Sequence, residues 1–236
     1  LAQGPNFSDW HWAQGLAGKE TLSGQKESRE WYEVPMTKID TADPDCVWRI
    51  RERIDQPSVV ELWSPVRWVT LLIKLQTTAR LGQTRMMDSG EADTFVFQEG
   101  KFVRNKSKLA QGTLRSPRNQ GAIRQSDQGG TVLYFNTNKT ADIKKVGSEK
   151  GMECPWPVFP EYQDDPYFWI AKLARWQSKY NPVEKATAWI DIPSSRRLKG
   201  KSEAVCSTYP DATFLFRTPE SPTEESFPIA YAGLYK

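Results

Sequence analysis

The side chains that perform most enzyme chemistry are scarce in this chain, and their scarcity excludes several mechanisms. Among 236 residues there is one histidine, His11, and there are three cysteines, Cys46, Cys154 and Cys206. A structural zinc site needs about four cysteine or histidine ligands, and a serine or cysteine nucleophile needs a histidine base. The widely spaced residues provide neither. We therefore expect a packed or surface histidine and three free thiols that are buried or half-buried.

Cofactor and metal signatures are also missing from the sequence. There is no glycine-rich phosphate loop followed by lysine, and no dinucleotide-binding glycine pattern after a strand. The acidic pairs Asp164-Asp165 and Glu224-Glu225 have no partners at the spacing of a glycosidase or a two-metal site. We expect no cofactor and no metal ion, and we interpret the acidic pairs as helix caps or solvated edges.

Basic side chains are the remaining candidates for chemistry, although the net charge is only +3. Residues 101–124 include seven lysines or arginines and no acidic residue, and a second basic cluster occupies residues 196–201. Extended basic loops can neutralise the phosphates of a nucleic acid and release its counterions. A solvated, flexible insertion is the alternative, and the charge pattern is compatible with both.

Two basic residues follow apolar segments. Arg80 comes directly after the predicted buried helix 66–76 and its short connection, at the start of the next helix. Lys139 lies in the polar turn 136–140, after an apolar run with the composition of a strand, residues 131–136. Arg80 therefore follows the end of a predicted helix, and Lys139 follows the end of a predicted strand.

Hydrophobic periodicity predicts the helices that must position these residues. Asp43-Pro44 suits a helix start, and Val47, Ile50 and Ile54 follow it at helical spacing. Ser58 and Glu61 fit a capping box. A helix is predicted over 66–76, with Val66, Val69, Leu72, Ile73 and Leu75 buried. A short helix is predicted over 79–88, with Leu81, Thr84 and either Met87 or Met86 inward. A third is predicted over 166–180, with Asp165 as cap and Trp169, Leu173, Trp176 and Tyr180 on one stripe.

Strand signals are fewer and short. Residues 93–104 predict a hairpin that turns at Gln98-Glu99-Gly100-Lys101, and residues 131–136 and 152–154 predict two more strands. The resulting fold class is mainly α with a small antiparallel β-sheet (α+β). With 38% hydrophobic residues the chain can build a core, as one large domain or two small ones. A mean hydropathy of −0.64 and the lack of a long apolar run exclude a transmembrane protein.

The segment around Arg80 resembles the first arginine motif of the tyrosine recombinases, or phage-type integrases. In that family a buried helix ends in a Thr-Gly-x-Arg-like turn, a short helix follows, and an acidic residue leads into a small sheet. Here Thr77-Thr78-Ala79-Arg80 takes the place of the turn and Glu91-Ala92-Asp93 the place of the acidic end. The sequence of residues 85–94 is similar to that of a divergent branch of the family, which is found in large mobile-element recombinases.

A second feature of the family, a lysine in a hairpin turn, has a counterpart at the expected place in this sequence. The family places a catalytic lysine in a hairpin turn after the second strand of its small sheet, and Lys139 follows the predicted strand 131–136. The return strand ends at Cys154-Pro155-Trp156-Pro157, which is similar to the short apolar strand of the family. The match covers residues 58–180 and implies a catalytic domain of the tyrosine-recombinase type.

The sequence departs from the family pattern at several points. The expected glycine and acidic residue that flank the arginine are Thr78 and Gln83 here, and residues 101–130 form a long basic insertion. The second motif, His-x-x-Arg, has no counterpart because His11 lies upstream, and Tyr231 and Tyr235 come too soon after the sheet to be called the nucleophile. We therefore expect a fragment: a loop-rich arm over residues 1–43 and a truncated catalytic domain over residues 44–236.

The resemblance implies DNA recombination or integration through a 3′-phosphotyrosyl intermediate. Arg80 would stabilise charge on the non-bridging phosphate oxygens, because a guanidinium group stays protonated and binds two oxygens. Lys139 would donate a proton to the leaving 5′-oxygen. The structural alternatives are an ion pair of Arg80 with Glu91 or Asp93, and an ordinary turn lysine at position 139.

Double-stranded DNA is the implied partner, bound by homo-oligomers that assemble on it, in the cytoplasm with the nucleoid and away from membranes. Two other classes of protein remain open: a non-catalytic DNA-binding protein of a mobile element on the same scaffold, and an unrelated helical domain. The predicted DNA-binding residues are Arg85, Lys101, Arg104, Lys106, Lys108, Arg115, Arg118 and Arg124.

Overall fold

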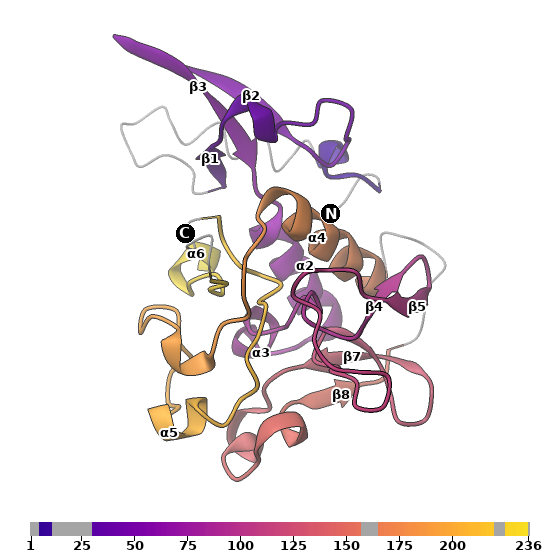
Figure 1. Ribbon diagram of the computed structural model, residues 1–236. Helices are drawn as coiled ribbons and strands as arrows, with labels where there is room; N and C mark the ends of the chain where they lie inside the picture. The colour runs from indigo at the N-terminus through magenta and orange to yellow at the C-terminus, as the bar shows by residue number, and fades with distance from the viewer. Residues whose placement is uncertain (1–4, 11–29, 157–164, 220–224, 236) are drawn as a thin grey trace.

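The computed structural model describes residues 5–10, 30–156, 165–219 and 225–235, and it shows helices combined with three small antiparallel sheets (Figure 1). The described α-helices and strands cover similar lengths of chain. His11 and the acidic pair Glu224-Glu225 each lie at least partly outside the described residues. The long helices are α2 (Val66–Thr77) and α4 (Pro166–Tyr180), and the short ones are α3 (Leu81–Arg85), α5 (Glu203–Cys206) and α6 (Ala232–Tyr235).

The first sheet has the strand order β1-β3-β2, with β1 (Trp31–Glu33), β2 (Trp48–Arg53) and β3 (Gln56–Trp63). In Figure 1 the β2–β3 hairpin extends away from the rest of the molecule. The helices predicted after residue 44 and from residue 58 are therefore wrong. Alternation of arginine with other residues along β2 was the missed signal, because it places three arginines on one face of the hairpin.

Cross-strand ion pairs explain why strands form there. Arg49 and Arg51 both donate to Glu61 of β3, at 2.7 and 2.6 Å, and Arg53 pairs with Glu33 of β1. Opposite charges on neighbouring strands stabilise a sheet modestly, and an isolated helix would leave the glutamates without these partners. Of the three residues at helical spacing, Val47 is buried in the core, whereas Ile50 and Ile54 are exposed, so they do not form one buried helix face.

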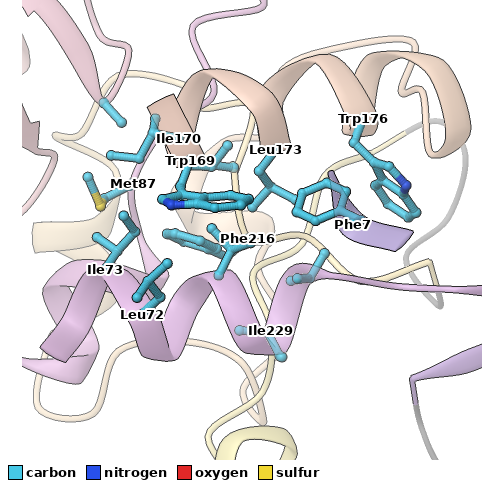
Figure 2. Close-up of a cluster of buried hydrophobic side chains, with 14 of the residues drawn as sticks. Phe7, Leu72, Ile73, Met87, Trp169, Ile170, Leu173, Trp176, Phe216 and Ile229 are labelled. Carbon is cyan, nitrogen blue, oxygen red and sulfur yellow. The ribbon is translucent and has the colours of Figure 1, made fainter. Parts of the chain in front are cut away.

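Helices α2 and α4 pack against each other and form the centre of the core (Figure 2). Both predictions are confirmed, including the cap at Asp165, whose carboxylate accepts a hydrogen bond from the Tyr167 amide at 2.9 Å. The predicted stripe of α4 is buried, and so are the predicted residues of α2 except Leu75, which is 62% exposed. The short helix is confirmed as α3, with Leu81, Thr84, Met86 and Met87 buried.

The predicted loose arm contributes to the core instead. Phe7 and Trp10 are fully buried, and Figure 2 shows Phe7 beside Leu173 and Trp176 of α4. The ring of Phe7 also lies 6.5 Å from that of Trp63 at the end of β3. Within residues 1–43, the described parts thus supply a strand and two core side chains.

The strands around Lys139 follow the prediction closely. The hairpin is β4 (Phe95–Gln98) and β5 (Lys101–Arg104), and its turn residues Glu99 and Gly100 have φ of 49° and 80°, as a tight hairpin turn requires. The last sheet has the order β6-β7-β8, with β7 (Thr131–Phe135) and β8 (Met152–Cys154) as predicted. The added strand β6 (Ile123–Gln125) belongs to the segment expected to be an insertion, so residues 101–130 are partly built into two sheets.

The three cysteines are free: Cys46 and Cys206 are buried and Cys154 is half-buried, as predicted. In the part of the chain described here, no helix is long and apolar enough to cross a membrane.

Candidate functional site

Arg80 stands between α2 and α3, at a point where the backbone changes direction. Thr78 ends α2 in the left-handed conformation, with φ of 53°, and Arg80 is the extended residue that caps α3. The side chain of Arg80 is exposed. Among the described residues, neither Glu91 nor Asp93 pairs with Arg80, because these carboxylates bind Arg217 and Arg118. The alternative of a structural ion pair at Arg80 therefore finds no support.

Gln83 connects the start of α3 to the turn that carries Lys139. Its side-chain oxygen accepts the backbone N–H of Arg80 at 3.2 Å, and its amide nitrogen donates to the carbonyl oxygen of Thr137 at 3.3 Å. The family pattern has an acidic residue at this position, but a carboxylate could not donate the second bond. The departure at Gln83 thus has a local reason, and one side chain joins the backbone of Arg80 to Thr137 in the turn that carries Lys139.

Lys139 is exposed at the first residue of the short 3-10 helix η4 (Lys139–Asp142). Its φ of 41° lies in the left-handed region, which is uncommon for a residue with a long side chain. Its carbonyl oxygen accepts a hydrogen bond from the ammonium group of Lys201 at 3.0 Å. The lysine of the predicted site therefore sits in a turn that other residues hold in shape.

Arg85 is not on the surface. Its guanidinium group is fully buried, donates to the carbonyl oxygens of Ile229 and Arg196 at 2.5 and 2.7 Å, and stacks on the ring of Tyr231 at 3.9 Å. A side chain without exposed surface cannot reach a DNA phosphate, so the DNA-binding prediction for Arg85 is corrected. Its role is to join α3 to the last segments of the chain.

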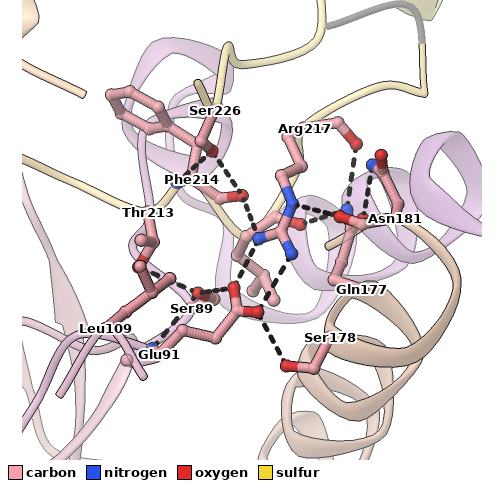
Figure 3. A network of polar contacts seen from close by, with 12 residues as sticks. Ser89, Glu91, Leu109, Gln177, Ser178, Asn181, Thr213, Phe214, Arg217 and Ser226 are labelled. Atoms are coloured by element: carbon pink, nitrogen blue, oxygen red, sulfur yellow. Dashed lines mark hydrogen bonds and ion pairs between the residues drawn. The ribbon is translucent and has the colours of Figure 1, made fainter. Parts of the chain in front are cut away.

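The acidic end of the arginine motif forms a buried polar network (Figure 3). Glu91 pairs with the fully buried Arg217 at 2.5 Å and accepts hydrogen bonds from Ser89 and Ser178, both at 2.7 Å. Burial by itself would raise the pKa of Glu91, but Arg217 and the two hydroxyl groups outweigh it and lower that pKa. This network connects α4 with the segment around Arg217.

Two further carboxylates lie beside it. Burial, and next the neighbouring Asp88, raise the pKa of Asp93 to about 7, although its oxygens accept the amides of Gln120 and Gly121. Asp88 is also buried, and burial raises its pKa as well. Arg118 faces both carboxylates, with its Nε 3.5 Å from Asp93.

The predicted DNA-binding residues divide into two groups. Arg118 is largely covered, and Arg124 binds Glu153 at 2.6 Å and lies 3.7 Å above the ring of Tyr134. The other group is exposed and lies on β5 and the loop that follows it: Lys101, Arg104, Lys106, Lys108 and Arg115.

A cavity of about 390 Å³ lies between β4 and α4, but neither Arg80 nor Lys139 lines it. Arg80 and Lys139 are both exposed, so a large substrate such as DNA can reach them. Among the described residues, no group of three or more histidine, cysteine or acidic side chains could hold a metal ion.

Sequence reasoning missed two polar residues that shape the site, Asp142 and Tyr209, and it noted Gln83 only as a departure from the family pattern. The second basic cluster was considered as a loop that could neutralise phosphates, and the structure brings its Lys201 to the Lys139 turn. Its middle residue Leu198 lies against α3, since a Cβ at Gly82 would be 3.2 Å from it. These contacts join segments more than fifty residues apart, and no local pattern signals them.

The chain belongs to an integrase family. Residues 1–190 match the family described as “Putative integrase”. No curated protein and no solved structure matched the chain. Membership assigns the protein to DNA integration or recombination at a coarse level, with DNA as the class of substrate.

Proposed function

We propose that this integrase acts as a tyrosine recombinase, and that the chain supplies two residues of its active site, Arg80 and Lys139. The observation that supports the proposal is the side chain of Gln83, which joins the start of α3, where Arg80 is exposed, to the turn where Lys139 is exposed. The fold proposed for residues 44–236 is accordingly part of a tyrosine-recombinase catalytic domain, and the nucleophilic tyrosine and second arginine box come from outside these residues.

In the proposed reaction a tyrosine oxygen attacks the DNA phosphorus, and the bond from phosphorus to the 5′-oxygen breaks. A 3′-phosphotyrosyl bond forms, so the energy of the phosphodiester is kept for rejoining. Arg80 binds two non-bridging oxygens, where negative charge accumulates in the transition state. Lys139 donates a proton to the departing 5′-oxygen. When the strand is rejoined, Lys139 takes a proton back from the attacking 5′-hydroxyl group.

The exposed basic residues of β5 and its following loop are the proposed contacts to the DNA backbone, and the protein is proposed to assemble as a homo-oligomer on DNA. Each phosphate contact contributes about one unit to the slope of log affinity against log salt concentration. Replacing Lys106 and Lys108 by alanine should therefore weaken binding and reduce that slope by about two. An unchanged slope would remove these two residues from the DNA surface.

The decisive test is Arg80→Ala in the full-length protein. We expect strand cleavage to fall at least a thousandfold while DNA affinity stays within about tenfold, because the arginine acts mainly on the transition state. Lys74→Ala, on α2, is a control that removes one positive charge and leaves Arg80 and Lys139 in place. Unchanged cleavage in Arg80→Ala would reject the assignment.

A non-catalytic DNA-binding protein on the same scaffold is the competing function. It predicts salt-dependent binding to double-stranded DNA and no covalent protein–DNA adduct. Trapping with nicked DNA followed by denaturing electrophoresis distinguishes the two, since only the recombinase leaves a protein attached to a 3′-phosphate.

A further inference from the structure

The turn that carries Lys139 is held by a fully buried carboxylate. Asp142 accepts the backbone N–H of Asn138 with one oxygen and the N–H of Gly151 with the other, at 3.0 Å for Gly151. Its carbonyl oxygen also accepts the ammonium group of Lys150 at 2.8 Å. One side chain thus ties the beginning of the β7–β8 connection to its end.

Tyr209 reaches this turn from a distant part of the chain. Its hydroxyl donates, at 2.8 Å, to the Asp142 oxygen that also accepts Asn138, and it lies 3.0 Å from the hydroxyl of Thr137. Its ring stacks on Trp189, with centroids 3.9 Å apart and an angle of 11°. The ammonium group of Lys150 lies 4.3 Å from the centre of the same ring. Because stacking on Trp189 holds the ring, the Tyr209 hydroxyl stays between Asp142 and Thr137.

Two more contacts tie the same distant segment to the β7–β8 connection. Lys201 donates to the carbonyl oxygen of Lys139, and the N–H of Gly147 donates to the carbonyl oxygen of Thr208 at 2.9 Å. A left-handed backbone at a lysine costs about 1 kcal/mol or more, so it persists only where neighbours hold it. These contacts supply that restraint.

We infer that Tyr209 and Lys201 are positioning residues that hold the Lys139 turn in its left-handed shape and so aim the Lys139 side chain. The claim that the Lys139 side chain points toward DNA rests on the proposed function. The claim that Tyr209 and Lys201 hold the turn does not. The segment 189–209 is thereby assigned a part in the site, although it lies well outside the arginine motif and the lysine turn.

The first test measures amide hydrogen exchange across residues 137–151. Tyr209→Phe removes one hydroxyl and keeps the stacked ring, and Thr137→Val removes the second partner of that hydroxyl. We expect both variants to speed exchange in this segment about tenfold, as the loss of one buried hydrogen bond predicts. Tyr180→Phe is the matched control, because its hydroxyl binds Asp43 in another part of the molecule. Exchange that stays at the control value in both variants would overturn the inference.

The second test separates positioning from general stability. A DNA substrate whose leaving 5′-oxygen is replaced by sulfur needs no proton donor, because a thiol has a pKa of about 8.5. With ordinary DNA, Tyr209→Phe and Lys201→Met should lower kcat about tenfold at unchanged DNA affinity. Sulfur substitution should restore both variants, and Lys201→Arg should retain activity because arginine can still donate to the Lys139 carbonyl.

The outcomes distinguish this inference from the proposed function. If sulfur substitution restores Lys139→Ala but not Tyr209→Phe, Tyr209 does not act through Lys139 and the inference is overturned. If sulfur substitution fails to restore Lys139→Ala itself, the proton-donor role in the proposed function is wrong. The hydrogen-exchange result then still decides whether Tyr209 holds the turn.

Discussion

Single buried charges in this molecule are held by specific partners, and the clearest case is the Glu91–Arg217 ion pair (Figure 3). Arg217 also donates to the carbonyl oxygen of Asn181 at 3.0 Å, so its guanidinium group is well satisfied. Removing one member of such a pair leaves an uncompensated charge in the interior, which costs much more than the pair itself contributes.

Glu91→Gln should therefore lower the free energy of unfolding by about 3–5 kcal/mol. Chemical denaturation monitored by the buried tryptophans measures this change. Glu99→Gln, at the exposed hairpin turn, is the control and should change stability by less than about 0.5 kcal/mol. If Glu91→Gln also lowered the free energy of unfolding by less than about 0.5 kcal/mol, the ion pair would contribute little to stability.

Asp93 predicts a pH dependence of stability. Its pKa is raised from an ordinary carboxyl value to about 7 in the folded protein, mainly by burial and also by Asp88, while Arg118 acts in the opposite direction. The folded state then binds more protons than the unfolded state between about pH 4 and pH 7. Stability contributed by protonated Asp93 is present at about pH 4 and is lost as the pH rises toward 7.

Asp93→Asn, which cannot ionise, should flatten this part of the stability profile. Denaturation midpoints measured from pH 4.5 to 7.5 provide the comparison with the unsubstituted protein. Equal slopes in the two proteins would show that Asp93 does not titrate in this range.

At the scale of elements, the junction between α3 and the β7–β8 turn depends on one amide. Gln83 accepts from Arg80 and donates to Thr137, so it needs both an oxygen and an N–H group. The acidic residue common in tyrosine recombinases would place a carboxylate oxygen against the Thr137 carbonyl. The element that carries Arg80 and the turn that carries Lys139 are therefore matched to each other in this chain.

Gln83→Glu should reduce stability by about 1–2 kcal/mol and lower cleavage more than DNA binding. The expected cause is repulsion between two oxygens that separates α3 from the turn. Gln98→Glu, at the exposed end of β4, makes the same chemical change away from the site and should have no effect on either quantity. Wild-type cleavage by Gln83→Glu would show that the junction is not needed for activity.

Across the whole molecule, a short N-terminal segment completes a core made mainly by α2 and α4. The ring of Phe7 lies 5.6 Å from Trp10 and 6.1 Å from Trp169, and none of the three is exposed by more than 1%. Large aromatic side chains in such a position fill volume that no other part of the chain can fill.

Phe7→Ala should lower the free energy of unfolding by about 3–5 kcal/mol, because it leaves a cavity among aromatic rings. Leu75→Ala, on the exposed side of α2, is the matched control and should cost less than about 0.5 kcal/mol. Thermal and chemical unfolding of the two variants would separate a core role from a loose arm, and equal stabilities would favour the loose arm.

The elements that could be predicted are those with short-range signals. Helix α4 has its cap, proline and apolar stripe within sixteen residues, and the β4–β5 hairpin has its turn residues between its strands. Arg80 and Lys139 could be chosen because each follows an apolar element of this kind. The strands β2 and β3 were mistaken for helices because their charges are balanced by residues of neighbouring strands.

Most local elements, the places of Arg80 and Lys139 at their ends, and the resemblance to integrases could be predicted from the sequence, since all of these depend on neighbours in the chain. Which polar groups meet depends on how the chain folds. The tertiary structure buries Arg85, pairs Glu91 with Arg217, and brings Tyr209 and Lys201 to the Lys139 turn. The physical reason is that a buried polar group must find a partner, and that partner can lie anywhere along the chain.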